Sequence, residues 1–402
     1  MRVFYPFAYY YPEQCAGIFV VDDVMREAAK QGVSSYLSVP TPTRDLPKDA
    51  SWLRNEVQEG GLIRIHRFRM YGEGRNPLLR ALRYLFCECA QMHGLLWKKY
   101  DVAFIDSTPP IQGLKMPFIK LFRRKPIVYN AQDIFPDSLV GTGLTRKGSL
   151  IWRIGRVVEK ITYKYADKII VISEDFKKNL LAKGVPEDKI EVVYNWVDVK
   201  AVCPVAKEDN PLFEVFGLNR GKFTIVYAGN LGNAQNINII LDAAKVLPNI
   251  QLAIFGTGGM EDEIRSRIHT EALDNVYLLP LQPQDKVKYV YSLGDACVVS
   301  CKSGLGGSAM PSKTWSIMAC GRPVLACFDE GELRKILEDN SCGIFTHAGN
   351  VEEFVNGIQT LASDYALCSK MGENGRRFVL RNLGKDAGAK KYVEIIKSVV
   401  KQ

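Results

Sequence analysis

A glycine-rich loop between a buried strand and a helix is the first candidate for chemistry in this sequence. Cys297–Ser300 is an apolar run typical of a strand buried on both faces, and glycines follow at 304, 306 and 307. Ser312 is placed to cap the next helix. Such a loop aims free N–H groups and the positive end of a helix dipole at one place, which suits a phosphate. Ordinary turning from strand to helix gives the same pattern, so the loop alone leaves both interpretations open.

Two lysines flank this loop and add positive charge to it. Lys313 stands at the start of the helix, and Lys302 stands just after the strand. A departing diphosphate needs positive charge, because its negative charge grows as the bond to it breaks. We therefore predict that Lys313 holds a diphosphate. Lys302 is the second candidate, and an ordinary surface lysine is the alternative for each.

Acidic side chains follow two strands of the first half of the chain. Asp106 comes directly after the apolar run Val102–Ile105, and Asp133 follows the strand predicted over 126–130. A carboxylate in such a place can orient or deprotonate a hydroxyl group of a substrate. The alternative for each is a carboxylate that caps a helix.

The elements that position these residues alternate between short apolar strands and helices. In the first half, strands are predicted over 1–5, 33–39, 62–69, 102–105, 126–130, 168–172 and 190–194. Helices are predicted over 18–31, 76–100, 111–122, 149–166 and from Ser173 onward. This alternation predicts an α/β fold with a parallel sheet covered by helices, which binds ligands beyond the carboxyl ends of its strands.

A second alternation of the same kind follows the first. Residues 201–221 are polar and contain Pro204 and Pro211, so we interpret them as a linker between a domain over 1–200 and one over 222–385. A last helix, over 386–402, has an apolar stripe that includes Tyr392, and it is predicted to pack back on the first domain.

Bulk composition excludes several classes of protein. The chain has 402 residues, which is too long for one ordinary core, and its apolar runs are too short to span a membrane. Ten cysteines and four histidines are scattered without metal-ligand spacing. The N-terminal residues lack the layout of a signal peptide, so we expect a cytoplasmic protein with reduced thiols.

The charge of the chain is concentrated in its first half. Residues 1–200 hold 31 Lys and Arg against 22 Asp and Glu, and so carry the whole formal net charge of +9. The densest basic segments are 64–69, 80–83 and 120–125, where Arg and Lys alternate with apolar residues. Such segments can rest on an anionic membrane surface, here the inner face, although solvated surface charge is an equal alternative. Nucleic acid is not favoured, because no binding module accompanies the charge.

The order of these signals resembles the retaining glycosyltransferases of family 4, with the GT-B fold, over essentially the whole chain. The branch that builds bacterial O-antigen, capsule and other exopolysaccharides is the most similar. The segments that carry the resemblance are Asp133–Pro136, Ile170–Glu174, Val193–Trp196, Val226–Asn230, Phe255–Gly258, Pro311–Lys313 and Met318–Pro323.

The resemblance implies two Rossmann-like domains that face each other across a cleft. It implies that the second domain binds a nucleotide sugar and the first binds the acceptor, with retention at the anomeric carbon and without a metal or other cofactor. The implied donor-side residues are Gly229, Asn230, Gly256, Gly258, Leu281, Lys302, Ser308, Ala309, Ser312 and Ser316. On the acceptor side, the implied residues are Glu13, Gln14 and Gly17, with Asp133, Asp106 and Lys313 as catalytic candidates.

Two departures from the family's common pattern bear on these roles. A pair of glutamates separated by seven intervening residues is replaced by Ser308 and Ser316, and a basic pair that holds the diphosphate is replaced by Asn230 and Gln235. The expected function is transfer of an N-acetylhexosamine or deoxyaminosugar from a UDP-sugar to a lipid-linked or saccharide acceptor. The missing glutamate pair motivates one alternative, a non-catalytic partner subunit. A sugar-nucleotide epimerase is a further alternative. Such enzymes use carboxylates and histidines in the cleft, and none of the four histidines stands obviously after a predicted strand.

Overall fold

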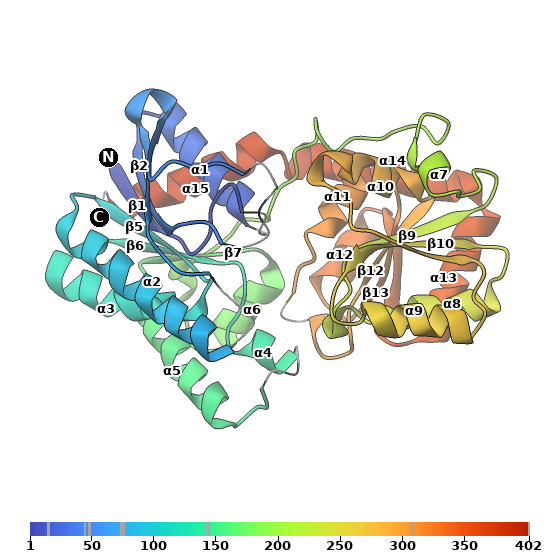
Figure 1. The fold of residues 1–402 in the computed structure, drawn as a ribbon, viewed down its shortest axis with the longest axis horizontal. Coiled ribbons are helices and arrows are strands. Elements are labelled where there is room, and N and C mark those ends of the chain that lie inside the picture. The colour runs from blue at the N-terminus through green and yellow to red at the C-terminus, as the bar shows by residue number, and fades with distance from the viewer. Residues whose placement is uncertain are drawn as a thin grey trace. The chain divides into compact units, whose positions relative to one another are not determined.

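A computed structural model describes residues 1–13, 17–43, 46, 50–72, 77–141, 143, 145–306 and 309–400. The chain forms two compact units, each an α/β sandwich with a central sheet (Figure 1). Unit 1 comprises Met1–Asn195 and Asp386–Gln402, and unit 2 comprises Trp196–Lys385.

Unit 1 is built on an eight-stranded sheet in the order β3-β4-β2-β1-β5-β6-β7-β8. Its strands are β1 Arg2–Pro6, β2 Ser34–Pro40, β3 Asn55–Gln58, β4 Ile63–Phe68, β5 Val102–Asp106, β6 Ile127–Ala131, β7 Lys168–Val171 and β8 Ile190–Val192. All neighbouring pairs are parallel except β3 with β4, which are antiparallel. The edge strand β3 was not predicted from the sequence, because its four residues alternate too briefly to be recognised.

Helices cover the sheet of unit 1. They are α1 Ile18–Lys30, α2 Pro77–Trp97, α3 Met116–Phe118, α4 Asp137–Gly141, α5 Leu150–Tyr165, α6 Glu174–Ala182 and α15 Lys385–Ser398. The helix predicted over 111–122 is not one regular helix. It is a 3₁₀ turn at Pro110–Lys115, the single turn α3 and a π-type turn at Ile119–Arg123. Pro117 lies within the predicted range, and a proline lacks the N–H that a continuous helix needs.

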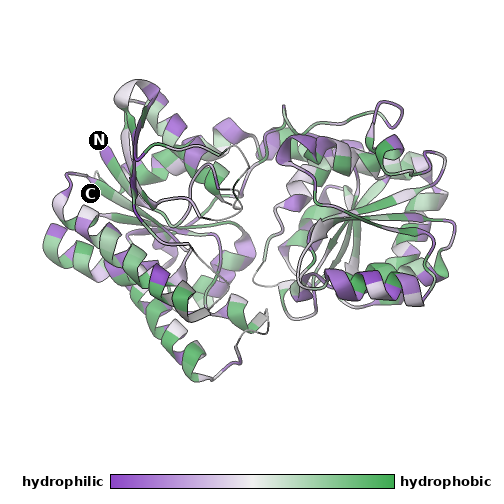
Figure 2. Ribbon diagram, in the orientation of Figure 1, coloured by the Kyte–Doolittle hydropathy of each residue, from purple (hydrophilic) through white to green (hydrophobic). Residues whose placement is uncertain are grey.

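Unit 2 is built on a six-stranded parallel sheet in the order β11-β10-β9-β12-β13-β14. The strands are β9 Thr224–Asn230, β10 Gln251–Thr257, β11 Val276–Leu279, β12 Ala296–Ser300, β13 Val324–Phe328 and β14 Gly343–His347. The helices are α7 Leu212–Val215, α8 Asn238–Val246, α9 Glu261–Thr270, α10 Val287–Leu293, α11 Lys313–Ala319, α12 Glu332–Asp339, α13 Val351–Ser363 and α14 Tyr365–Asn382. Apolar residues gather on the strands and on the helix faces that cover them (Figure 2).

Within the described residues, none of the helices combines the length and the hydropathy needed to cross a bilayer. In that same part of the chain, no group of three His, Cys, Asp or Glu side chains is arranged to hold a metal ion.

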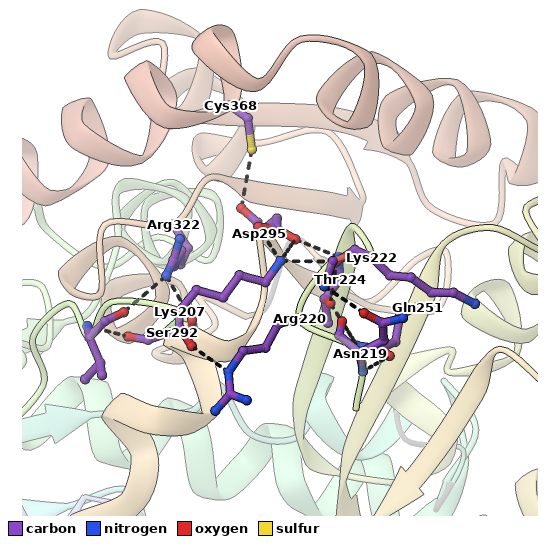
Figure 3. Close-up of polar contacts among 12 residues, drawn as sticks. Lys207, Asn219, Arg220, Lys222, Thr224, Gln251, Ser292, Asp295, Arg322 and Cys368 are labelled. Carbon is purple, nitrogen blue, oxygen red and sulfur yellow. Dashed lines mark hydrogen bonds and ion pairs between the residues drawn. The ribbon is translucent and has the colours of Figure 1, made fainter. Parts of the chain in front are cut away.

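Residues 201–221, interpreted above as a linker, are bound to unit 2 by polar contacts (Figure 3). The Lys207 ammonium donates to the buried carboxylate of Asp295 at 2.9 Å and to the carbonyl of Lys222 at 3.1 Å. The same carboxylate accepts the backbone N–H of Thr224, the first residue of β9, at 2.7 Å. Asp295 therefore joins the start of β9, the start of β12 and the 201–221 segment.

Replacing Lys207 by Met should destabilise unit 2. It would leave the Asp295 carboxylate buried without its cation, which we expect to lower the free energy of unfolding by about 1–3 kcal/mol. Calorimetry of the full chain should show the transition of unit 2 several degrees lower. Lys245→Met is the matched control, because Lys245 forms a more exposed ion pair with Glu271 and such pairs contribute little. Equal midpoints for the two variants would contradict the role of Lys207.

Candidate functional site

Lys313, the first residue of α11, lies at the carboxyl ends of the strands of unit 2. Its Nζ is 4.1 Å from the centroid of the Tyr227 ring. It also lies close to the backbone of Gly229, because a Cβ added there would be only 2.7 Å from this nitrogen. Among the described residues, no carboxylate forms an ion pair with it. A lysine held on an aromatic face without a counter-ion is a candidate for binding an anion.

Burial lowers the pKa of Lys313 to about 7. The cause is desolvation, which penalises the charged form. A bound anion would favour the ammonium and raise the pKa again. Anion binding at this place is therefore coupled to proton uptake near neutral pH.

The prediction that Ser312 caps α11 is wrong. Ser312 has helical φ and ψ, and its side chain makes no capping hydrogen bond. Because α11 has only seven residues, its dipole is small, and the case for an anion at this edge depends on the Lys313 side chain and the nearby backbone.

Three predicted glycines allow the carboxyl ends of β9 and β10 to approach closely. A Cβ at Gly256 would be 2.1 Å from the carbonyl oxygen of Gly229, and one at Gly258 would be 2.6 Å from the backbone of Leu231. Gly229 itself has a φ of 143°. A hydrogen bond of 2.9 Å from the Leu231 N–H, just after β9, to the carbonyl of Thr257, the last residue of β10, joins the two ends.

A small cavity of about 100 Å³ opens beside Gly229. It is lined by Ala228, Gly229, Phe255, Leu281, Gln282, Val287, Val290 and Tyr291. Leu281 is more than half exposed there. The structure thus brings Gly229, Gly256, Gly258, Leu281 and Lys313 together at one edge of the sheet.

The remaining donor-side candidates lie nearby but are differently engaged. The Lys302 ammonium is hydrogen-bonded to the side chain of Asn233, and the Ala309 N–H donates to the Gly306 carbonyl at 3.2 Å. The Asn230 carbonyl accepts the Tyr227 hydroxyl at 2.8 Å. Ser316 is half-buried in α11. Ser308 lies outside the described residues.

On unit 1, Asp106 ends β5 and is buried. Its carboxylate accepts the side-chain N–H of Asn130 at 2.8 Å and the backbone N–H of Thr108 at 3.3 Å. Burial raises the pKa of Asp106 to about 7, although both hydrogen bonds lower it. The Asn130 amide oxygen accepts the hydroxyl of Tyr392, on α15, at 3.0 Å and the side chain of Gln132 at 3.0 Å.

Asp133 and the first loop are arranged differently. Asp133 is exposed in the turn before α4, near Asp137 and Ser138, and is not part of the Asp106 network. Glu13 is buried, and its carboxylate accepts the backbone N–H groups of Thr43 at 2.9 Å and Tyr10 at 3.4 Å. It thereby holds two loops together.

Gly17 precedes α1 with a φ of 91°, a left-handed conformation that favours glycine. Gln14 lies outside the described residues.

Two contributors to these sites were missed in the sequence. Tyr227 lies two positions before Gly229, so the period-2 alternation of β9 puts both on one face and could have identified it. Tyr392 lies 262 residues from Asn130, its hydrogen-bond partner, and no local pattern could have paired them.

Both units match known protein families. Residues 19–201 match the family described as Glycosyltransferase Family 4. Residues 208–378 match the family described as Glycosyl transferases group 1. The chain belongs to the family 4 glycosyltransferases.

Several of its curated relatives are bacterial glycosyltransferases. The probable glycosyltransferase WbjE of Pseudomonas aeruginosa is 25% identical over 61% of this chain and 62% of its own length. The putative colanic acid biosynthesis glycosyl transferase WcaI of Escherichia coli is 26% identical over 67% of each chain. The match thus leaves about a third of each relative unaligned.

The name of a third relative describes the transfer of a sugar to a lipid-linked saccharide. It is the N-acetylgalactosamine-N,N'-diacetylbacillosaminyl-diphospho-undecaprenol 4-alpha-N-acetylgalactosaminyltransferase of Campylobacter jejuni, 22% identical over 52% of this chain and 55% of its own length.

Solved structures show the same fold, GT-B. HepE of Anabaena in complex with UDP has a TM-score of 0.73 and 17% identity, and the match covers 99% of each chain. Sucrose-phosphate synthase of Thermosynechococcus elongatus has a TM-score of 0.76 and 17% identity, over 99% of this chain and 98% of that one.

The close approach at Gly256 generates a prediction about stability. Gly256→Ala would place a methyl group against the Gly229 carbonyl and should lower the thermal midpoint of unit 2 by several degrees, as overpacking typically costs about 1–3 kcal/mol. Gly259→Ala, in the turn that follows β10, is the matched control, since a Cβ there would meet no atom within 4 Å. A Gly256→Ala protein as stable as Gly259→Ala would show that the ends of β9 and β10 are not in close contact.

Proposed function

We propose that this chain transfers a sugar from a UDP-sugar to a saccharide or lipid-linked acceptor during the synthesis of a bacterial surface polysaccharide. The observation that carries the proposal is the unpaired Lys313 ammonium beside Gly229. A cation without a counter-ion, next to a glycine-lined backbone edge, is suited to a diphosphate. Family membership and the names of the relatives support the reaction class.

The surroundings of Lys313 support a nucleotide as the donor. The cavity beside Gly229 is lined mainly by apolar side chains and lies next to the same glycine. A nucleotide base bound in this cavity, with its diphosphate toward Lys313, would contact both the apolar lining and the lysine ammonium. UDP is proposed because HepE, which has the same fold, is seen with UDP and with UDP-glucose.

In the proposed mechanism, Lys313 and nearby backbone N–H groups stabilise the diphosphate as it leaves the sugar. This is electrostatic stabilisation of charge that develops in the transition state. It supplies the positive charge that Asn230 and Gln235, at the positions of the family's basic pair, do not carry. Retention at the anomeric carbon and a reaction without metal or other cofactor are proposed from the resemblance alone.

Asp106 is the proposed acceptor-side carboxylate. With a pKa near 7 it is partly ionised at neutral pH and can accept a proton from a hydroxyl group. Asp133 remains the rival, because its exposed position at the end of β6 also allows contact with an acceptor.

The sugar and the place of reaction are part of the proposal. The name of the Campylobacter relative supports an N-acetylhexosamine and a diphospho-undecaprenol acceptor. A deoxyaminosugar is the other donor sugar predicted. A lipid-linked acceptor would bring the chain to the inner face of a membrane, where the predicted partner is an anionic surface.

A second candidate function follows from the absent glutamate pair. Ser316 and Ser308 stand where two carboxylates are common, which favours a non-catalytic partner subunit that binds a nucleotide sugar without transferring it. Hydrolysis or transfer of a UDP-sugar by the purified chain alone would exclude this function.

Lys313→Met should weaken UDP binding. Loss of a charged hydrogen bond costs about 1.5–3 kcal/mol, or roughly 10- to 100-fold in Kd measured by calorimetry. Because free Lys313 titrates near pH 7, wild-type affinity should fall as the pH rises from 6 to about 9, and the variant should lose this dependence. Lys370→Met, on α14, is the control. Unchanged affinity in Lys313→Met would remove the lysine from the site.

Asp106→Asn should lower kcat without weakening UDP binding. If Asp106 is the base, wild-type activity should rise with pH through about 7 as the carboxylate ionises, and the variant should lose this step. Asp133→Asn is compared in the same assay. A larger loss of kcat in Asp133→Asn would assign the role to Asp133 instead.

A further inference from the structure

Exposed apolar side chains are concentrated on three neighbouring segments of unit 1. Of the 26 large apolar side chains exposed in the described part of the chain, 13 lie on α2, on residues 114–122 and on α5. They are Leu79, Leu82, Leu85, Phe86, Trp97, Leu114, Phe118, Leu121, Phe122, Leu150, Ile151, Ile154 and Val157. These segments pack side by side, with α3 between the two long helices (Figure 1). We call these residues the apolar surface.

The described outward side of α2 is mainly apolar. Its exposed apolar residues are Leu79, Leu82, Leu85, Phe86 and Trp97, and Cys89 and His93 are exposed between the last two. The described exposed positions of this helix include no Lys, Arg, Asp or Glu. The polar Gln91 instead faces inward, where its side chain donates to the Phe7 carbonyl at 2.6 Å. An ordinary surface helix has the opposite arrangement.

The outward side of α5 combines apolar and basic residues. Its apolar residues Leu150, Ile154 and Val157 recur at helical spacing, and Arg153, Lys160 and Lys164 are exposed beside them. The only carboxylate of α5, Glu159, is buried and paired with Arg156 and Lys183. The exposed side of α5 is therefore apolar and positive, which complements the headgroup region of an anionic bilayer.

A cationic pocket adjoins the apolar surface. It has a volume of about 650 Å³ and lies between α5 and residues 183–189, with Arg156, Lys160, Lys164, Lys183 and Lys189 in its wall. Val157 lines the pocket and belongs to the apolar surface as well.

Of these five cations, Arg156 and Lys183 are paired with carboxylates, and the other three are not. Glu159 and Asp137 pair with Lys183 at 2.6 and 2.7 Å, and Glu159 also pairs with Arg156. Among the described residues, Lys160 and Lys164 form no ion pair with a carboxylate. Lys189 forms none either, but its ammonium donates to the backbone carbonyls of Lys164 at 3.2 Å and Ala166 at 2.8 Å. The pocket therefore carries excess positive charge beside an apolar surface.

We propose that unit 1 inserts the apolar surface into an anionic bilayer and that the cationic pocket binds the phosphate of a lipid headgroup. This deepens the proposed function, on which it rests for the lipid-linked acceptor. The basic residues proposed to contact the membrane also differ from those predicted from the sequence. Arg67 and Arg123, from two of the segments predicted to meet a membrane, donate to backbone carbonyls of Leu53 and Leu96 instead.

Vesicle flotation tests the proposal. The full chain is mixed at low salt with vesicles of phosphatidylcholine, alone or with phosphatidylglycerol. Wild type should float only with the anionic vesicles. Ile154→Ser/Val157→Ser should weaken this binding at least tenfold, because burying two such side chains in the bilayer is favourable. Val246→Ser, at an exposed apolar site on α8, should bind like wild type.

Single charge reversals test the pocket itself. Lys160→Glu and Arg153→Glu change the same charge on the exposed side of α5, but only Lys160 lines the pocket. Lys160→Glu should lose at least tenfold more affinity for anionic vesicles than Arg153→Glu. Equal losses would overturn the lipid-phosphate site, and a wild-type chain that ignores anionic vesicles would overturn the whole inference.

UDP binding separates this inference from the proposed function. The vesicle-binding variants should keep wild-type UDP affinity in a thermal-shift titration, which also shows that they are folded. If wild type binds anionic vesicles but not UDP, the proposed reaction fails and the membrane surface stands.

Discussion

The close contact between the carboxyl ends of β9 and β10 is the constraint on which the site of unit 2 depends. Gly256 lies so near the Gly229 carbonyl that no side chain fits there, and the Leu231 N–H, just after β9, donates to the carbonyl of Thr257 at the end of β10. Lys313, from α11, lies against the backbone of Gly229 at this edge of the sheet. Charge, glycines and aromatic ring form one site because parallel strands end at the same edge.

The fold could largely be predicted because buried parallel strands are short apolar runs separated by helices. Val102–Ile105 and Cys297–Ser300 lie within β5 and β12, and Ser149 and Ser173 cap α5 and α6 with their side chains. Where local pattern was weak, the prediction failed. The short strand β3 depends on pairing with β4, and the turns over 110–123 depend on prolines and packing rather than on periodicity.

The candidate site was predictable only in part, for a related reason. Residue type and position after a strand singled out Lys313 and Asp106, but their pKa values depend on burial, which is a tertiary property. Lys302 was the second candidate from the sequence, and its ammonium is hydrogen-bonded to the side chain of Asn233. Glu13 was named as an acceptor-side residue, but two backbone N–H groups donate to its buried carboxylate. Sequence spacing does not show which charges are already satisfied.

The return of α15 to unit 1 has a consequence for how the chain folds during synthesis. The hydrogen bond between Asn130 and the hydroxyl of Tyr392 can form only after all of unit 2, Trp196–Lys385, has been translated. Unit 2 is continuous in sequence and can fold as soon as it leaves the ribosome, since domains generally fold as units. Translation of unit 1 starts before that of unit 2 and is completed after it. Its Asp106 network is completed only after unit 2 has been translated, so a truncated chain that lacks α15 would lack the Tyr392 hydroxyl that donates to Asn130.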